Sequence, residues 1–286
     1  MRWSSGNRGN IEDARGRSFG GMRGGAGLGI GGFLVLIVLS WATGTDLTSI
    51  IGGLDQGPSS TVTESQGQIQ TSPEEERMVD FVDAVAGDTQ ETWQRLLGTN
   101  YQATRVVLFR DATQSGCGAA ESATGPFYCP ADQKVYLDLG FFAQLSQRFG
   151  APGDFAQAYV IAHEFGHHVQ NLLGTNERVR SGSMGANSAS VALELQADCY
   201  AGVWGHEASQ GGRFQAGKVE LEPGDADEAL RAASVIGDDH LQKMSTGRVQ
   251  PERFTHGTSA QRMEWFQRGM KTGDPRQCDT FAQLTQ

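Results

Sequence analysis

Three residues in one short segment have the types and the spacing of a catalytic zinc site: His163, Glu164 and His167. If the segment is a helix, the two histidines lie on successive turns of one face and can bind one ion, a geometry that zinc accepts. Glu164 lies about 100° further round the helix, which suits it to accept a proton from a metal-bound water rather than to bind the metal. The segment therefore predicts a zinc ion bound by His163 and His167, with Glu164 as general base.

A second pair of polar residues supplies the ligand that the histidines lack. A catalytic zinc site has three protein ligands and an open fourth position. Glu194 and Asp198, in a later segment, would again share one face of a helix. We expect Glu194 to be the third ligand, and Asp198 to accept the Nδ1 proton of His163 and so fix its tautomer.

The alternative is that these side chains have structural roles, as hydrogen-bonded core histidines and as carboxylates on a solvated helix face. Apolar neighbours argue against it, because buried polar groups need partners. The neighbours are Val160, Ile161, Ala162, Val169 and Leu172 in the first segment, and Val191, Ala192, Leu193, Leu195, Ala197, Val203 and Trp204 in the second. A metal ion would be such a partner for all three predicted ligands.

The elements that must position these residues are mostly helices. The pattern of apolar residues predicts helices over 73–97, 154–173, 187–209, 225–244 and 259–272. The first begins with Ser72 as N-cap and Pro73 in the first turn. Two strand-like runs follow it, at 105–109 and 134–139. The predicted fold class is α+β, mostly helical with a small antiparallel or mixed sheet.

Charge divides the chain into two unequal parts. Residues 1–44 have a net charge of +3 and the remainder −13, and the total of −10 argues against nucleic acid as a partner. The 22 residues 24–45 carry no charge and include a strongly apolar run, so we expect a transmembrane anchor there. The arginines before it predict a cytoplasmic N-terminus, because positive residues favour that side. A cleaved signal peptide is the alternative.

This anchor sets the predicted domain organisation and localisation. Residues 1–23 would be a cytoplasmic N-terminal segment, and 24–45 a single span of the cytoplasmic membrane. Residues 46–72, rich in Gly, Ser and Thr, would be a flexible linker. Residues 73–286 would then form one domain on the periplasmic or extracellular side.

Four cysteines, Cys117, Cys129, Cys199 and Cys278, are expected to form two disulfides in an exported domain. Three pairings are possible in principle. Cys117 and Cys129 flank a loop rich in Gly, Ser and Pro, and closing it would contribute about 3 kcal/mol in the chain-entropy model. We favour this pairing, which leaves Cys199 with Cys278 and ties the C-terminal tail to an internal helix. Four free, buried thiols are the alternative.

Several longer stretches of the sequence resemble one known family. They are Met1–Trp3, Asn10–Asp13, Gly125–Asp132, His163–Gln170, Glu194–Gly202 and Phe254–Ser259. Together with a single anchor, they are similar to the bacterial putative neutral zinc metallopeptidases. The resemblance implies a zincin-like fold of the glutamate-liganded type, in which a small sheet accompanies a helix with the two histidines and a second helix with the glutamate.

One further role, a group that stabilises the oxyanion of the tetrahedral intermediate, has two candidates, His240 and His256. We prefer His256, because it lies in the stretch that matches the family and the glycine after it permits a tight loop. The predicted function is zinc-dependent hydrolysis of a peptide or protein substrate by an endopeptidase. A metal-binding membrane scaffold without proteolytic activity, and a zinc amidase acting on cell-wall material, are the alternatives.

Overall fold

The structure is a computed structural model that describes residues 1–18, 65–66, 69–179, 183–210 and 218–285. The helices of this part are α3 (Pro73–Leu97), α4 (Gly140–Gln147), α5 (Asp154–Leu172), α6 (Ala189–Ala208), α7 (Asp225–Val235), α8 (Asp238–Thr246) and α9 (Ser259–Thr272). The strands are β1 (Arg2–Trp3), β2 (Ile11–Asp13), β3 (Arg17–Ser18), β4 (Ser65–Gln66), β5 (Val106–Phe109), β6 (Ala112–Ser115), β7 (Gly118–Glu121), β8 (Phe127–Cys129), β9 (Lys134–Asp138) and β10 (Val219–Glu220). The fold is α+β, as predicted.

The main sheet has the strand order β2-β5-β9-β8. Strands β2, β5 and β9 are parallel, and β8 is antiparallel to β9, so the sheet is mixed. The two runs predicted as strands are β5 and β9, and every residue of β5 is buried. β6 and β7 form a separate hairpin beside it, and β1 and β3 each pair with one further short strand.

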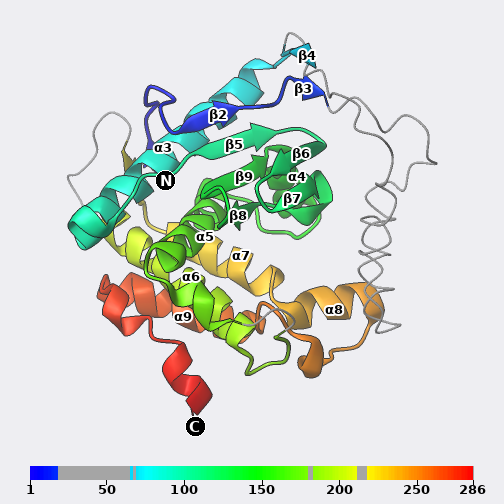
Figure 1. The fold of residues 1–286 in the computed structure, drawn as a ribbon, viewed down its shortest axis with the longest axis vertical. Coiled ribbons are helices and arrows are strands. Elements are labelled where there is room, and N and C mark those ends of the chain that lie inside the picture. The colour runs from blue at the N-terminus through cyan, green and yellow to red at the C-terminus, as the bar shows by residue number, and fades with distance from the viewer. Residues whose placement is uncertain (19–64, 67–68, 180–182, 211–217, 286) are drawn as a thin grey trace.

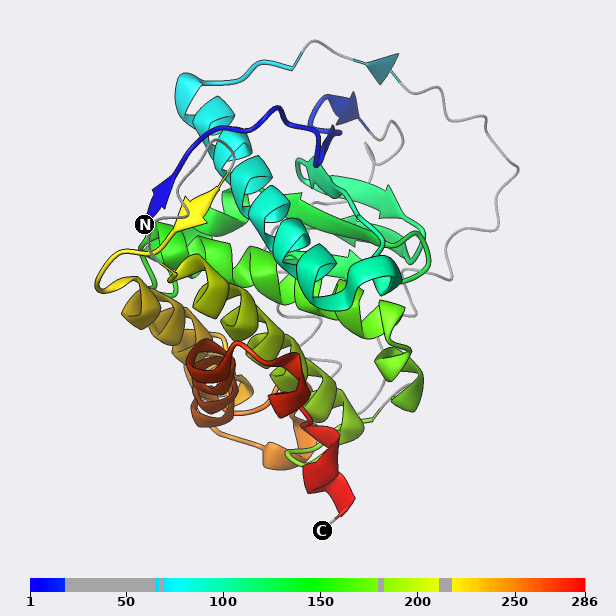
Figure 2. The same cartoon turned by 90° about the vertical axis from the view of Figure 1, so that its left-hand side faces the viewer.

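Helix α5 lies between the sheet and helices α6 and α7 (Figure 1). It contacts β8 and β9 on one side and α6 and α7 on the other, while α3 packs against it from the N-terminal half of the chain (Figure 2). Its buried residues include Phe155, Tyr159 and Phe165, which belong to the hydrophobic core. The helix that carries the two histidines is therefore held on several sides.

Glycines allow close approach between the helices around the site. A Cβ atom on Gly166 of α5 would lie 3.0 Å from the backbone of Ala197 on α6. A Cβ atom on Gly202 or Gly269 would lie 2.1 or 2.0 Å from a backbone oxygen of the facing helix, which fixes α6 against α9. The backbones of α5, α6 and α9 are thus close enough for short polar side chains to meet between them.

The helix predicted over 225–244 is interrupted, so that part of the prediction is wrong. It forms two helices, α7 and α8, separated by Ile236 and Gly237. Gly237 has an extended backbone (φ −69°, ψ 146°), and a Cβ atom there would lie 2.3 Å from the backbone nitrogen of Ser259. The close packing of the start of α9 against Gly237 is the reason for the break.

The first 18 residues pack onto the rest of the domain. β1 pairs with β10, and β2 forms the edge of the main sheet beside β5. The guanidinium group of Arg15, with 2% of the side chain exposed, forms ion pairs with Asp13 at 2.6 Å and with Glu75 and Glu76 of α3 at 2.9 Å. The N-terminal segment is therefore fixed to α3 and to the sheet.

This arrangement overturns the predicted localisation. A single span over 24–45 would place residues 1–23 and 73–286 on opposite sides of the membrane, yet β2 and β5 belong to one sheet. In addition, none of the helices in the described residues is long and apolar enough to cross a membrane. The single-pass topology, with a cytoplasmic N-terminus and a periplasmic or extracellular domain, is therefore wrong. The predicted anchor and most of the predicted linker lie outside the described residues.

Both favoured cysteine pairings are present. Cys117 and Cys129 form one disulfide, and Cys199 and Cys278 form the other, with S–S distances of 2.05 and 2.00 Å. The first closes the loop between β6 and β8, and the second joins the C-terminal segment to α6. The pairing predicted from the cysteine spacing is confirmed.

Candidate metal centre

The three predicted ligands converge at the interface of α5 and α6. The Nε2 atoms of His163 and His167 lie 3.1 Å apart. The carboxylate oxygens of Glu194 lie 3.2 Å from Nε2 of His163 and 3.5 Å from Nε2 of His167. Each residue thus directs one ligand atom to a common point, as a single ion requires.

These distances fit zinc. Zinc with bonds of about 2.0–2.1 Å in a tetrahedral site holds its ligand atoms about 3.3 Å apart. The Nδ1 atoms of His163 and His167 each lie 2.8 Å from a side-chain oxygen, of Asp198 and of Gln170. Each Nδ1 therefore donates, and the two Nε2 lone pairs face the carboxylate of Glu194. Electron-rich groups in such an arrangement need a cation between them, and the donor set of two imidazoles and one carboxylate suits zinc.

Protons compete for the same position in the metal-free protein. Burial lowers the pKa of His163, but the charge of Asp198 and the hydrogen bonds to Asp198 and Glu194 outweigh it and raise the pKa to about 10. For Glu194, burial acts in the opposite direction and raises the pKa. The charge of His167 and the hydrogen bonds from both histidines outweigh this effect and bring the pKa of Glu194 well below its usual range. The negative charge at this site therefore attracts any cation, and a metal must displace a proton to bind.

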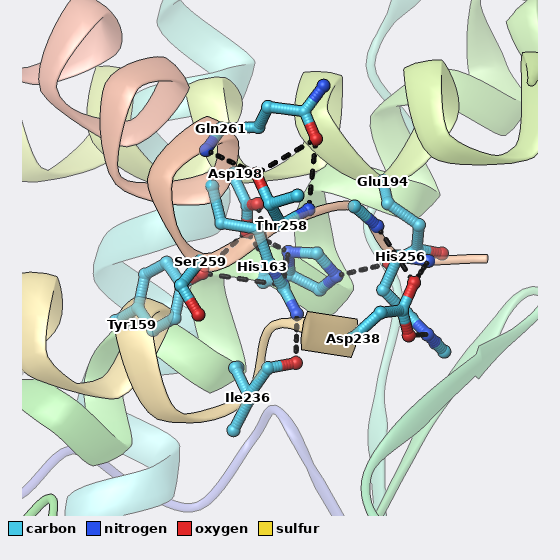
Figure 3. Close-up of polar contacts among 12 residues, drawn as sticks. Tyr159, His163, Glu194, Asp198, Ile236, Asp238, His256, Thr258, Ser259 and Gln261 are labelled. Carbon is cyan, nitrogen blue, oxygen red and sulfur yellow. Dashed lines mark hydrogen bonds and ion pairs between the residues drawn. The ribbon is translucent and has the colours of Figure 1, made fainter. Parts of the chain in front are cut away.

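His163 is supported by a buried network of charged and hydroxyl groups (Figure 3). Oδ1 of Asp198 accepts hydrogen bonds from Nδ1 of His163 at 2.8 Å and from the hydroxyl of Tyr159 at 2.5 Å. Arg262 of α9 donates to both oxygens of Asp198 at 2.8 Å. Burial raises the pKa of Asp198, but the charges of Arg262 and His163 lower it to about 2. Asp198 is thus a charged acceptor with a fixed orientation.

The candidate site opens into a cavity of about 900 Å³. Its wall includes the metal-binding residues, Glu164 and His256. The remainder of the wall is largely apolar and comes from the loop before β8, from the region of α4 and from α8. Its larger apolar side chains are Phe127, Phe141, Phe149, Leu193, Ile236, Leu241 and Met244. The metal centre is therefore reached through a cavity with a largely apolar wall.

Glu164 lies in this cavity beside the ligands. The residue is 7% exposed, and its carboxylate has no hydrogen-bond or ion-pair partner within the part of the chain that the structure describes. A buried carboxylate without a partner is costly unless a ligand or solvent supplies one. Glu164 is therefore placed to accept a proton from a group that enters the cavity.

His256 also lines the cavity, from the loop before α9, and Asp238 at the start of α8 fixes that loop. Oδ2 of Asp238 accepts the backbone N–H groups of Thr255 and His256 at 2.7 Å and of Gly257 at 3.0 Å. Oδ1 lies 3.3 Å from Nδ1 of His256, whose side chain is 50% exposed. Loss of solvent lowers the pKa of His256, but the hydrogen bond to Asp238 and the charge of Glu194 raise it above its usual value. His240, the other candidate, is not part of the cavity wall.

Several residues of the site were missed by the sequence analysis. They are Arg262, Gln170 and Asp238 as hydrogen-bond partners and Tyr159 as the partner of Asp198. Spacing offered a signal for two of them: Tyr159 precedes His163 by four residues, and Gln170 follows His167 by three. Nothing in the sequence linked Arg262 to Asp198, because that contact depends on the packing of α9 against α6.

A second group of carboxylates, Asp154, Asp225 and Glu228, also comes close together. The backbone ammonium group of Met1 lies 3.0 Å from Asp154 and 3.1 Å from Asp225. The positive charge of this ammonium group therefore balances these carboxylates, and we do not assign them to a metal.

Comparison with known proteins identifies the family of this chain. The model of the family described as "Putative neutral zinc metallopeptidase" matches residues 1–281. The uncharacterized protein YpfJ of Escherichia coli K12 is 46% identical over 296 residues, which cover 98% of this chain and 99% of that protein. The uncharacterized protein Rv2575 of Mycobacterium tuberculosis H37Rv is 46% identical over 220 residues, 75% of each chain. No solved structure matches. The resemblance seen in the sequence is confirmed, and the chain belongs to the putative neutral zinc metallopeptidase family.

Proposed function

We propose that this protein is a zinc-dependent endopeptidase of the glutamate-liganded, zincin-like type. The observation that carries the proposal is the convergence of His163, His167 and Glu194 beside an unpartnered Glu164 in one cavity. His163, His167 and Glu194 would hold the zinc ion. A zinc ion in such a site lowers the pKa of a bound water to about 7 and polarises a substrate carbonyl.

Glu164 would act as general base and later as proton donor. Its carboxylate lines the same cavity as the ligand set, and no described residue forms a hydrogen bond or ion pair with it that would have to be displaced. A protein that uses a metal only for structure has no need of such a group, and this supports an enzyme over a metal-binding scaffold. The proton that Glu164 accepts from water can be passed to the departing amine.

His256 would assist by donating a hydrogen bond to the oxyanion of the intermediate. Asp238 faces Nδ1 of His256 and holds the backbone of its loop. The other nitrogen, Nε2, is then available to the cavity, and the raised pKa of His256 favours its protonated form. Asp238 acts here as a positioning residue for His256.

The first experiment measures zinc content and hydrolysis in the same preparations. We expect one zinc ion per chain, and cleavage of casein and of a peptide with both ends blocked, each abolished by a chelator and restored by zinc. Glu164→Gln should retain zinc but lower kcat by about 100-fold to 10,000-fold, because it removes the general base. His163→Ala should lose both zinc and activity. Glu252→Gln, an exposed residue outside the cavity wall, is the matched control and should change neither.

Two results would contradict the proposal. Zinc retention by His163→Ala would show that the ligands are assigned wrongly. Hydrolysis of amide bonds in purified cell-wall fragments, with release of new amino and carboxyl groups while casein and the blocked peptide stay intact, would favour the amidase alternative.

A further inference from the structure

The second metal-binding histidine, His167, is connected to the C-terminal segment by a chain of buried amide groups. Nδ1 of His167 lies 2.8 Å from Oε1 of Gln170. Nε2 of Gln170 donates to the backbone oxygen of Leu193 at 2.7 Å and to Oε1 of Gln196 at 3.1 Å. Nε2 of Gln196 donates to the backbone oxygen of Cys278 at 2.9 Å. Gln170 is completely buried, and Gln196 is 7% exposed.

The direction of this chain is fixed at both glutamines. A backbone carbonyl can only accept a hydrogen bond, so the group facing Cys278 must be the amide nitrogen of Gln196. Its oxygen then faces Gln170, whose nitrogen is also held by the carbonyl of Leu193. Turning over either amide would place two oxygens against each other. Each glutamine therefore has only one favourable orientation.

This direction determines how His167 presents its ring. Because the oxygen of Gln170 faces Nδ1, that nitrogen must carry a hydrogen and donate it. The lone pair of a neutral His167 is consequently on Nε2, which lies 3.1 Å from Nε2 of His163 and 3.5 Å from Glu194. The amide chain thus orients the ring and selects the tautomer that can bind a metal.

The far end of the chain is held by a disulfide. Cys278 is bonded to Cys199, which follows Asp198 on α6. The hydroxyl of Thr280 also donates to the backbone oxygen of Ala192 at 2.5 Å. Both contacts fix the C-terminal segment on the helix that carries Glu194, and with it the carbonyl that orients Gln196.

We propose that Gln170 and Gln196 are positioning residues, and that their hydrogen-bond chain couples the Cys199–Cys278 disulfide to the retention of zinc at His167. This inference rests on the metal site of the proposed function. It assigns to the C-terminal disulfide a role in metal binding in addition to its role in stability. Among the described residues, no chain of hydrogen bonds leads from the disulfide between Cys117 and Cys129 to Nδ1 of His167, so this disulfide serves as a matched control.

The test is the rate at which zinc passes from the loaded full-length protein to a coloured chelator. Gln170→Met keeps a similar side-chain volume but removes the acceptor, and we expect zinc release to be about 10-fold to 100-fold faster. Gln196→Met and Cys199→Ala/Cys278→Ala should each accelerate release less, by about threefold to tenfold, because Leu193 still holds Gln170. Combining the last two changes should add little, since both act on one chain. Cys117→Ala/Cys129→Ala should leave the rate unchanged.

A second measurement does not need zinc or activity. The ¹⁵N chemical shifts of the His167 ring in the metal-free protein report which nitrogen carries the hydrogen. We expect a hydrogen on Nδ1 in the wild type, and a mixture of tautomers in Gln170→Met, at a pH where the ring is neutral. Loss of overall stability alone would not produce this change.

The outcomes separate this inference from the proposed function. Faster release in Gln170→Met alone, with Gln196→Met and the Cys199–Cys278 variant unchanged, would overturn the chain. Equal acceleration in the Cys117–Cys129 control would overturn it too, since the effect would then be general destabilisation. If the Cys199–Cys278 variant does not fold, the rate of zinc release from Gln196→Met tests the hydrogen-bond chain. If the wild-type protein binds zinc but cleaves no peptide, only the proposed endopeptidase function is contradicted. If the wild-type protein binds no zinc, the ¹⁵N measurement on the His167 ring still tests the hydrogen-bond chain.

Discussion

The two metal-binding histidines are oriented by networks of opposite character. Nδ1 of His163 faces the carboxylate of Asp198, which is paired with the buried guanidinium of Arg262. Nδ1 of His167 faces Gln170, and from there the contacts are between uncharged groups. The same task, a hydrogen held on Nδ1, is thus performed once by a charged acceptor and once by a neutral one.

The two networks therefore differ in the free-energy cost of removing one of their members. A buried charge pair stabilises its surroundings only while both partners are present, because a single buried charge is strongly unfavourable. A chain of amides carries no such penalty, but each of its members has to donate and accept in one direction. We therefore expect the network of His163 to control folding and its pH dependence, and the network of His167 to act mainly on metal binding.

The largest effect is expected from removing the cation of the charged network. Arg262→Met leaves Asp198 buried without its main partner and should lower the free energy of unfolding by about 3–5 kcal/mol. Denaturant unfolding of the metal-free protein measures it. Arg268→Met is the control on the same helix: that side chain is 40% exposed, and its loss should cost no more than about 1 kcal/mol. Equal costs for the two arginines would remove the basis of the comparison.

Acid should affect the two networks differently. The folded-state pKa of Asp198 is about 2, below the 3.8 of an unperturbed Asp. Its stabilising contribution is therefore present above about pH 4 and is lost as the pH falls toward 2, with a slope of up to about 1.4 kcal/mol per pH unit. Asp198→Asn should flatten the pH dependence of the unfolding free energy in this window, and Gln170→Met should leave it unchanged. A parallel decline in wild type and Asp198→Asn would contradict the assigned charge.

The smallest effect on stability is expected on the neutral side. Gln170→Met removes the acceptor of the Nδ1 hydrogen of His167 and the donor to Oε1 of Gln196, which should cost about 1–3 kcal/mol in the metal-free protein. Thermal unfolding at neutral pH provides the measurement. A loss as large as that of Arg262→Met would mean that both networks contribute equally to folding.

The local parts of the site could be predicted from the sequence. Residues four apart on a helix share a face, so the pair His163 and His167 and the pair Glu194 and Asp198 were assigned to two helices that the structure confirms as α5 and α6. The apolar neighbours correctly indicated that these helices are buried. The start of α3 followed from Ser72, whose hydroxyl accepts from the backbone of Glu75.

The parts that depend on distant segments could not be predicted. Arg262 reaches Asp198 because glycines bring α9 against α6, and a sequence does not show which faces of two helices meet. The N-terminal strand β2 was missed because its apolar content is small and its partner β5 follows more than ninety residues later. With β2 unrecognised, the uncharged residues 24–45 were interpreted as an anchor between two compartments.

The pairing of the N-terminal strands has a consequence for biosynthesis. Arg2 and Trp3 pair with Glu220 and Val219, so two segments separated by more than two hundred residues along the chain lie side by side. Loop closure over so long a separation is slow and cannot occur until most of the polypeptide has been translated. β1 is therefore translated long before its partner β10, and until β10 emerges the backbone groups of β1 are exposed to other nascent chains and to chaperones.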